Sequence, residues 1–113
     1  MEKVNTRHLN KKLLEVDEDT LLLQLYALDN EIRWNIVKIL YNNPEGLFFD
    51  DLYDLTGLKG KGSLVYHLKI LKKANLVRNE YIEKRKGKKF SRCKLTDGCK
   101  KLLHTLLQGL SQA

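Results

Sequence analysis

The chain has 113 residues, of which 42% are hydrophobic and 31% charged. These values fit one folded domain and exclude a disordered chain. No apolar run approaches the length needed to span a membrane, and the first residues lack the apolar stretch of a secretion signal. Two cysteines are too few for a secreted disulfide scaffold. We therefore expect a cytoplasmic protein with no membrane association.

Charge is distributed unevenly along the chain, whose net charge is +7. Residues 21–56 carry two Lys/Arg and six Asp/Glu, whereas residues 57–101 carry 15 Lys/Arg and three Asp/Glu, a net +12. Such a concentrated basic region is the electrostatic footprint of a polyanion-binding protein. The alternative interpretation is a basic surface that only keeps the protein soluble.

Apolar residues at helical spacing predict three helices in the first third of the chain. One lies in an N-terminal arm, residues 1–20, and a second carries the leucines of residues 21–28. The third starts at a cap on Asp29 or Asn30 and runs to about Tyr41. We expect the main domain to comprise the remaining residues, 21–113.

The middle of the chain predicts a short extended piece and then two helices. The extended piece is 47–48, and the first helix, 49–56, stops at Gly57. After a glycine-containing loop, Ser63 is a suitable cap for the second helix, 64–74. Two short helices joined by such a turn can place the second one in a DNA major groove.

The last third changes from helical to extended periodicity. Residues 76–84 and 90–95 read as two strands, joined by a tight turn in which Gly87 supplies the positive φ. Thr96, with the aspartate after it, is a suitable cap for a final helix over 96–110. The fold class is therefore mainly α with a small β-hairpin.

The helix predicted over 64–74 presents a face suited to DNA. With Leu64, Leu68 and Leu71 turned inward, small, aromatic and basic residues lie on or beside its outer face: Gly62, Ser63, Val65, Tyr66, Lys69 and Lys73. Small residues at the helix start allow a phosphate to approach. Tyr66 can donate a hydrogen bond or stack, Val65 can touch a thymine methyl, and Lys69 can reach guanine or phosphate. The alternative is an ordinary solvated helix face.

The turn between the two predicted strands is a second basic element. Six cations fall within nine residues: Lys84, Arg85, Lys86, Lys88, Lys89 and Arg92. A basic hairpin beside a recognition helix can grip the DNA backbone, mainly by salt-dependent contacts. The alternative is a solvated hairpin whose lysines prevent edge-to-edge aggregation.

Several stretches of the sequence resemble the ArsR/MarR-type winged-helix transcriptional regulators. They are residues 27–33, 52–58 and 94–96 and, as the tightest match, LVYHLKILKKANLV at 64–77. The resemblance covers about residues 27–110. It implies a winged helix-turn-helix fold and a homodimer that binds palindromic operators through two recognition helices and two wings.

Leucines at both ends of the chain indicate a dimer interface. The final helix is rich in leucine and carries no Lys, Arg, Asp or Glu after residue 101, so we expect it to pack against its counterpart and the N-terminal helix. The expected interface residues are Leu9, Leu13, Leu102, Leu103, Leu106, Leu107 and Leu110. The alternative is that this helix closes the monomer's own core.

The chain lacks the metal-binding residues of the sensors that it resembles. The helix predicted over 49–56 has no Cys-x-Cys pair, and the last helix has too few ligands for a tetrahedral site. We expect Cys93 to be a small buried residue and His67 a packed, hydrogen-bonded one. Cys99 lies near a helix start, where a thiolate could be stabilised, so a redox role stays open. We expect neither a metal nor a cofactor.

Motifs that would indicate other functions are incomplete. Residues 57–60 match the GXXG loop of RNA-binding KH domains. That fold requires three strands, and the sequence shows only two clear ones. No nucleophile–base pair or carboxylate dyad indicates an enzyme.

The sequence therefore predicts a homodimeric regulator that reads double-stranded DNA. The recognition helix enters the major groove, and the basic wing holds the flanking backbone. Two alternatives remain: an architectural protein that coats DNA without reading its sequence, and a winged helix that binds another protein. The sequence names no effector.

Overall fold

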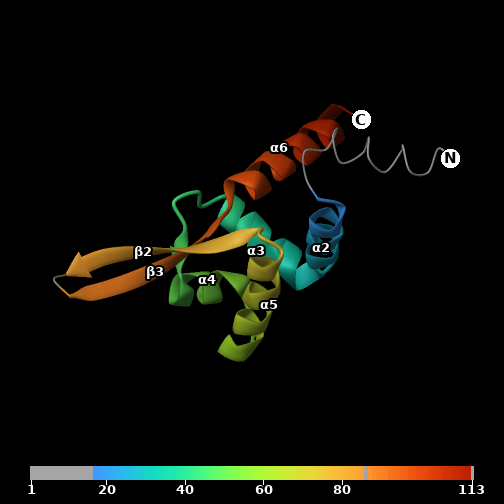
Figure 1. The fold of residues 1–113 in the computed structure, drawn as a ribbon. Helices are drawn as coiled ribbons and strands as arrows, with labels where there is room; N and C mark the ends of the chain where they lie inside the picture. The colour runs from blue at the N-terminus through green and yellow to red at the C-terminus, as the bar shows by residue number, and fades with distance from the viewer. Residues whose placement is uncertain (1–16, 86, 113) are drawn as a thin grey trace.

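Helices surround a small sheet, from which a long hairpin extends (Figure 1). The computed structural model describes residues 17–85 and 87–112. Their elements are, in order, α2 (Glu18–Leu28), α3 (Glu31–Tyr41), β1 (Leu47–Phe48), α4 (Phe49–Thr56), α5 (Lys61–Lys73), β2 (Val77–Arg85), β3 (Lys88–Leu95) and α6 (Asp97–Gln112). This confirms the mainly helical fold with a β-hairpin.

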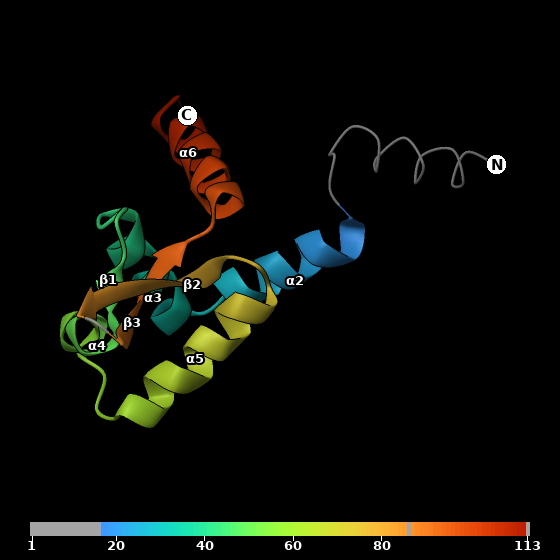
Figure 2. The same ribbon diagram turned by 60° about the vertical axis from the view of Figure 1, so that its left-hand side comes forward.

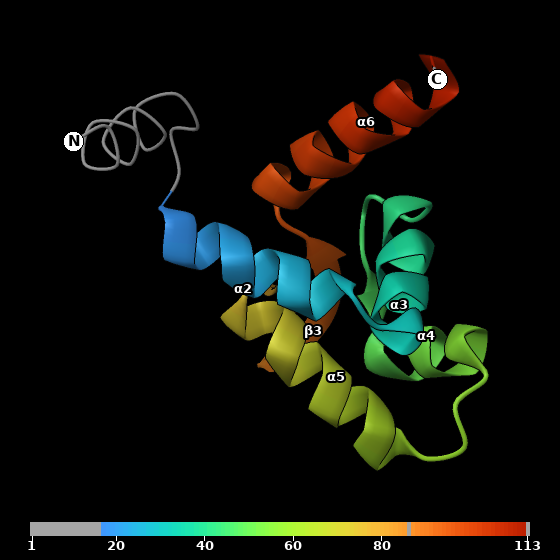
Figure 3. The same cartoon turned by 90° about the vertical axis from the view of Figure 1, so that its right-hand side faces the viewer.

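The N-terminal boundary expected at residue 20 falls inside α2, which begins at Glu18. The arm helix predicted before it, with Leu9 and Leu13, lies outside the described residues. The C-terminal half of α2 packs near the end of α5 (Figure 3), where Gln24 Nε2 donates to the Ala74 carbonyl over 3.1 Å. No helix in the described part of the chain is long and apolar enough to cross a membrane.

The start of α3 confirms the predicted cap and identifies it as Asn30. The Asn30 side chain accepts a hydrogen bond from the Arg33 backbone N–H over 3.0 Å, which satisfies one of the otherwise unpaired first-turn donors. Ile36, Val37 and Leu40 are fully buried. Because they recur at helical spacing, they turn one face of α3 into the centre of the core.

The start of α5 differs from the prediction. The helix begins at Lys61, its N-cap is Gly60, and no side chain caps it. Ser63 therefore lies in the first turn, where its N–H bonds to the Gly60 carbonyl over 3.2 Å. Glycine is itself an acceptable N-cap, and the helix starts three residues earlier than expected. The stop of α4 at Gly57 is confirmed by its left-handed φ of 69°.

The sheet has three strands among the described residues, whereas the sequence analysis found two. The order is β1-β3-β2, and Leu47 and Phe48 of β1 pair with Cys93 and Arg92 of β3. Gly46 makes this pairing possible, because its φ is +92° and a Cβ there would meet the Cys93 carbonyl oxygen at 2.9 Å. The strand count used against a KH fold was therefore wrong.

The hairpin is tighter than predicted. β2 and β3 pair from Val77–Leu95 to Arg85–Lys88, with an irregularity near Glu83, so the strands continue closer to the turn than the expected 76–84 and 90–95. Gly87 has the predicted positive φ, +80°. The result is a long two-stranded ribbon whose far end stands away from the helices (Figure 1).

The final helix starts where predicted and extends to Gln112. The Thr96 hydroxyl accepts from the Cys99 N–H over 3.1 Å, which confirms it as the cap. Only the beginning of α6 joins the core, because Leu103 is buried and residues 104–110 are exposed. The rest of the helix projects from the body (Figures 2 and 3).

Candidate nucleic-acid interface

The exposed face of α5 carries all the residues that were expected to meet DNA from the recognition helix. Each of them is exposed: Gly62, Ser63, Val65, Tyr66, Lys69 and Lys73. Lys61 and Lys72 are exposed on the same helix. No acidic residue occurs between Lys61 and Lys73. The N-terminal end of α5 projects from the body (Figures 1 and 3), so the face is accessible along its length.

Leucines hold α5 in this orientation. Leu64, Leu68 and Leu71 are all buried, as predicted, and belong to one apolar core with Ile36, Leu52 and other residues. Their i, i+4, i+7 spacing fixes the rotation of α5 about its axis. The basic face is thereby directed away from the core.

A buried polar pair also helps to fix the orientation of α5. Arg33 of α3 and His67 of α5 are 4% and 7% exposed. Arg33 Nη1 lies 3.1 Å from His67 Nδ1, and Arg33 Nε donates to the Ala27 carbonyl over 2.7 Å. Because a guanidinium can only donate, Nδ1 must be the unprotonated acceptor. The predicted packed, hydrogen-bonded His67 is confirmed.

Burial and the neighbouring guanidinium determine the protonation of this histidine. Burial is the larger effect and the Arg33 charge the smaller, and both hold the pKa of His67 below its usual 6.5. The neutral ring therefore predominates at neutral pH. Sequence analysis missed the role of Arg33, since nothing in a single sequence distinguishes a buried arginine on an amphipathic helix from an exposed one.

Some of the acidic charge before α5 is neutralised locally. Lys61 Nζ lies 3.0 Å from Asp50 Oδ1 in an exposed ion pair, and also 5.8 Å from the centre of the Tyr53 ring. The hydrogen bond to Asp50 raises the pKa of Lys61. Asp50, on the helix before α5, therefore has a cation beside it.

The hairpin places most of the predicted wing residues around its tip. Lys84, Arg85, Lys88 and Lys89 occupy the last positions of β2 and the first of β3. Lys86 lies outside the described residues. The backbone arrangement groups four cationic residues of the described strands at one end of the ribbon.

Arg92 lies apart from this tip. It sits on β3, the central strand, opposite Glu80 of β2. Its Nη2 lies 3.1 Å from Glu80 Oε1, and Lys94 and Arg78 lie 3.6 and 3.8 Å from the other Glu80 oxygen. The Arg92 hydrogen bond, followed by the Lys94 charge, holds the pKa of Glu80 below its usual value. Arg92 thus pairs within the sheet, which the count of cations along the sequence did not anticipate.

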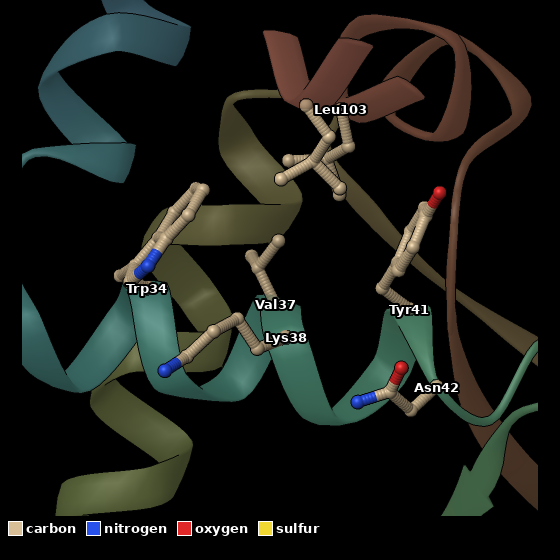
Figure 4. A pocket seen from close by; sticks show the side chains of 7 residues that line it. Trp34, Val37, Lys38, Tyr41, Asn42 and Leu103 are labelled. Atoms are coloured by element: carbon tan, nitrogen blue, oxygen red, sulfur yellow. The ribbon is translucent and has the colours of Figure 1, made fainter. Parts of the chain in front are cut away.

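The leucines of α6 divide into two groups. Leu103 is 3% exposed and completes the protomer's own core, and Leu102 is half-buried. Leu106, Leu107 and Leu110 are exposed. A cavity of about 230 Å³ opens between α3 and α6, and Trp34, Tyr41 and Leu103 are among its lining residues (Figure 4). The start of the helix therefore belongs to the monomer's core, and its later leucines are exposed to solvent.

Both cysteines are buried and free of disulfides. Burial raises the pKa of Cys93 and that of Cys99 to about 11 each. The inward position of Cys93 is confirmed. At Cys99, burial opposes the thiolate that a helix start could stabilise. Within residues 17–85 and 87–112, no three side chains of the metal-binding types come together.

Comparisons with known proteins support the fold. No protein-family model and no curated protein matches the sequence. Among solved structures, HlyU from Vibrio cholerae N16961 is 21% identical, with a TM-score of 0.62 over 82% of this chain and 96% of that one.

Two further structures are similarly related. One is the homodimeric winged helix-turn-helix DNA-binding domain of Mb0332 from Mycobacterium bovis, a possible ArsR-family transcriptional regulator. It is 20% identical, with a TM-score of 0.65 over 90% of this chain and 85% of that one. The other is NadR in complex with 4-hydroxyphenylacetate, 20% identical, with a TM-score of 0.62 over 99% of this chain and 74% of that one. The chain thus has the winged-helix fold that its resemblance to ArsR/MarR-type regulators implied.

Proposed function

We propose that this protein is a homodimeric transcriptional regulator that binds double-stranded DNA in a sequence-specific manner. The observation that carries the proposal is the exposed face of α5, where Tyr66 and Lys69 lie outward on a helix held by a buried leucine stripe. A helix of this width fits the major groove, and donors at its centre can reach base edges.

The hairpin supplies the second part of the proposed mechanism. With residues 63–73 in the major groove, the role that we propose for the wing, residues 85–89, is to bind the flanking backbone. Contacts by its lysines neutralise phosphates and release counterions, so they contribute affinity on any sequence. Arg92 is left out of this set because it pairs with Glu80. Recognition of the base sequence is thus assigned to α5, and sequence-independent binding of the DNA backbone is assigned to the wing.

The homodimer is proposed from α6 and the fold. Leu106, Leu107 and Leu110 form an exposed apolar surface on a helix that projects from the body, and such surfaces mark interfaces. Among structures with the same fold, the Mb0332 domain is homodimeric. A two-fold axis would give two recognition helices, which suits a palindromic site.

Fluorescence anisotropy with two labelled duplexes across a salt series tests the function. One duplex is the region upstream of the protein's own gene, and the other is a scrambled version of it. We expect a preference for the first that survives physiological salt. Equal binding that collapses with salt would favour an architectural protein instead. Binding to neither would favour a winged helix that recognises another protein.

A further inference from the structure

Val65 is an exposed apolar side chain beside a hollow on the basic helix. It is 55% exposed, and the hollow, of about 310 Å³, is lined by Phe49, Val65, Leu68, Lys69 and Lys72. Three of these side chains are apolar and two are cationic. The hollow therefore combines an apolar floor with two ammonium groups.

This combination suits an apolar group carried by a polyanion. Val65 and Lys69 are one helical turn apart on α5 and Lys72 is one turn further, so the cations lie on the same side of the helix as the valine. Lysines on that side can meet phosphates while the valine faces the base edges. The only apolar group that the major groove of unmodified DNA offers is the C5-methyl of thymine.

We propose that Val65 and this hollow read thymine by its C5-methyl group, and so determine part of the sequence preference. The inference rests on the proposed function, since it requires α5 to lie in the major groove. Tyr66 is assigned a different role because its ring meets the His67 ring edge-on, with centroids 5.0 Å apart. Its hydroxyl remains suited to a hydrogen bond.

Deoxyuridine provides a probe that removes only this methyl group. A preferred duplex is first selected by the wild-type full chain from a pool with random central sequence. Each thymine in it is then replaced in turn by deoxyuridine, and the dissociation constant is measured at physiological ionic strength. At one or two thymines in each half-site, we expect wild-type affinity to fall about fourfold, the contribution of one buried methyl.

Two variants assign that loss to Val65. Val65→Ala should bind the thymine and deoxyuridine duplexes equally, about as weakly as the wild type binds the deoxyuridine duplex. Val65→Thr keeps the side-chain shape but exchanges a methyl for a hydroxyl, so its methyl sensitivity should also fall. Leu55→Ala, which truncates an exposed leucine of α4, is the matched control and should behave as the wild type.

The outcomes separate this inference from the function on which it rests. If a sequence is selected but no thymine is sensitive to deoxyuridine, or if Val65→Ala retains the full sensitivity, methyl reading by Val65 is overturned and DNA binding stands. If the pool yields no preferred sequence, the proposed function fails and methyl reading fails with it.

Discussion

Arg33 and His67 meet inside the core, with Nη1 and Nδ1 3.1 Å apart. The pair joins α3 to the middle of α5, and Arg33 Nε also holds the Ala27 carbonyl at the end of α2. One guanidinium thereby connects three helices. A buried charge with neutral acceptors is stable only while those acceptors remain in place, so the pair should constrain how α5 sits on the body.

Replacing Arg33 should therefore destabilise the protein. Arg33→Met keeps much of the side-chain volume but leaves His67 Nδ1 and the Ala27 carbonyl without their buried partner. We expect the free energy of unfolding to fall by about 2–4 kcal/mol in urea titrations. Lys38→Met, at an exposed position of the same helix, is the matched control. Equal stability of the two variants would show that the buried pair does not stabilise the fold.

The same pair predicts a dependence of stability on pH. The pKa of His67 is held below 6.5 in the folded protein by burial and by Arg33, whereas the unfolded chain has the ordinary value. Below about pH 6.5 the unfolded state therefore binds more protons, and stability is lost as the pH falls towards the folded pKa.

Urea unfolding between about pH 7.5 and pH 5 measures this effect. The wild type should lose stability over that range, and His67→Gln, which keeps an acceptor but cannot titrate, should lose less. The range ends above the ordinary pKa of Glu80, 4.5, whose carboxyl is also held below its usual value and would act in the same direction at lower pH. Parallel curves for the two proteins would contradict the assignment to His67.

Much of the fold could be predicted because local signals and tertiary structure agree. Asn30 caps α3, Gly57 ends α4 and Thr96 caps α6, and each uses local backbone chemistry that a short sequence window contains. The buried stripe of α5 follows from helical periodicity. The outward residues of that helix could be identified for the same reason.

What could not be predicted depends on contacts between distant residues. The extended piece at 47–48 was predicted, but its pairing with Cys93 and Arg92, which makes it a strand of the sheet, was not. Arg92 was expected to contact DNA because it lies close to the cations of the turn in sequence. In the structure it pairs with Glu80 on the adjacent strand. Arg33 can be buried because the Ala27 carbonyl and His67 Nδ1 provide hydrogen-bond partners for its guanidinium. Pairings of this kind leave no periodic signal in one sequence.

The thiols of Cys93 and Cys99 should react slowly in the folded protein. Burial raises the pKa of each to about 11, so little thiolate is present near pH 8. A chromogenic disulfide reagent should label neither thiol quickly in buffer and both at once in denaturant. Rapid labelling of either thiol in the native protein would restore a redox role as a working hypothesis.

The proposed dimer depends on the exposed end of α6. Placing charges there by Leu106→Glu with Leu110→Glu should weaken association at least about tenfold, because carboxylates would have to be buried. Sedimentation equilibrium measures the change. Leu55→Glu, at an equally exposed leucine of α4, should leave the dimer intact. If the wild-type protein stays monomeric at high concentration, the proposed dimer interface on α6 is wrong.

Four variants separate sequence recognition by α5 from backbone binding by the wing. Dissociation constants are measured by anisotropy across a salt series, on the preferred and the scrambled duplex, for two pairs of variants. We expect Tyr66→Ala and Lys69→Ala to lose mainly the preference between the duplexes. Lys88→Ala and Lys89→Ala should weaken both duplexes alike and each lower the salt slope by about 1. Equal losses on both duplexes from all four variants would contradict sequence reading by α5.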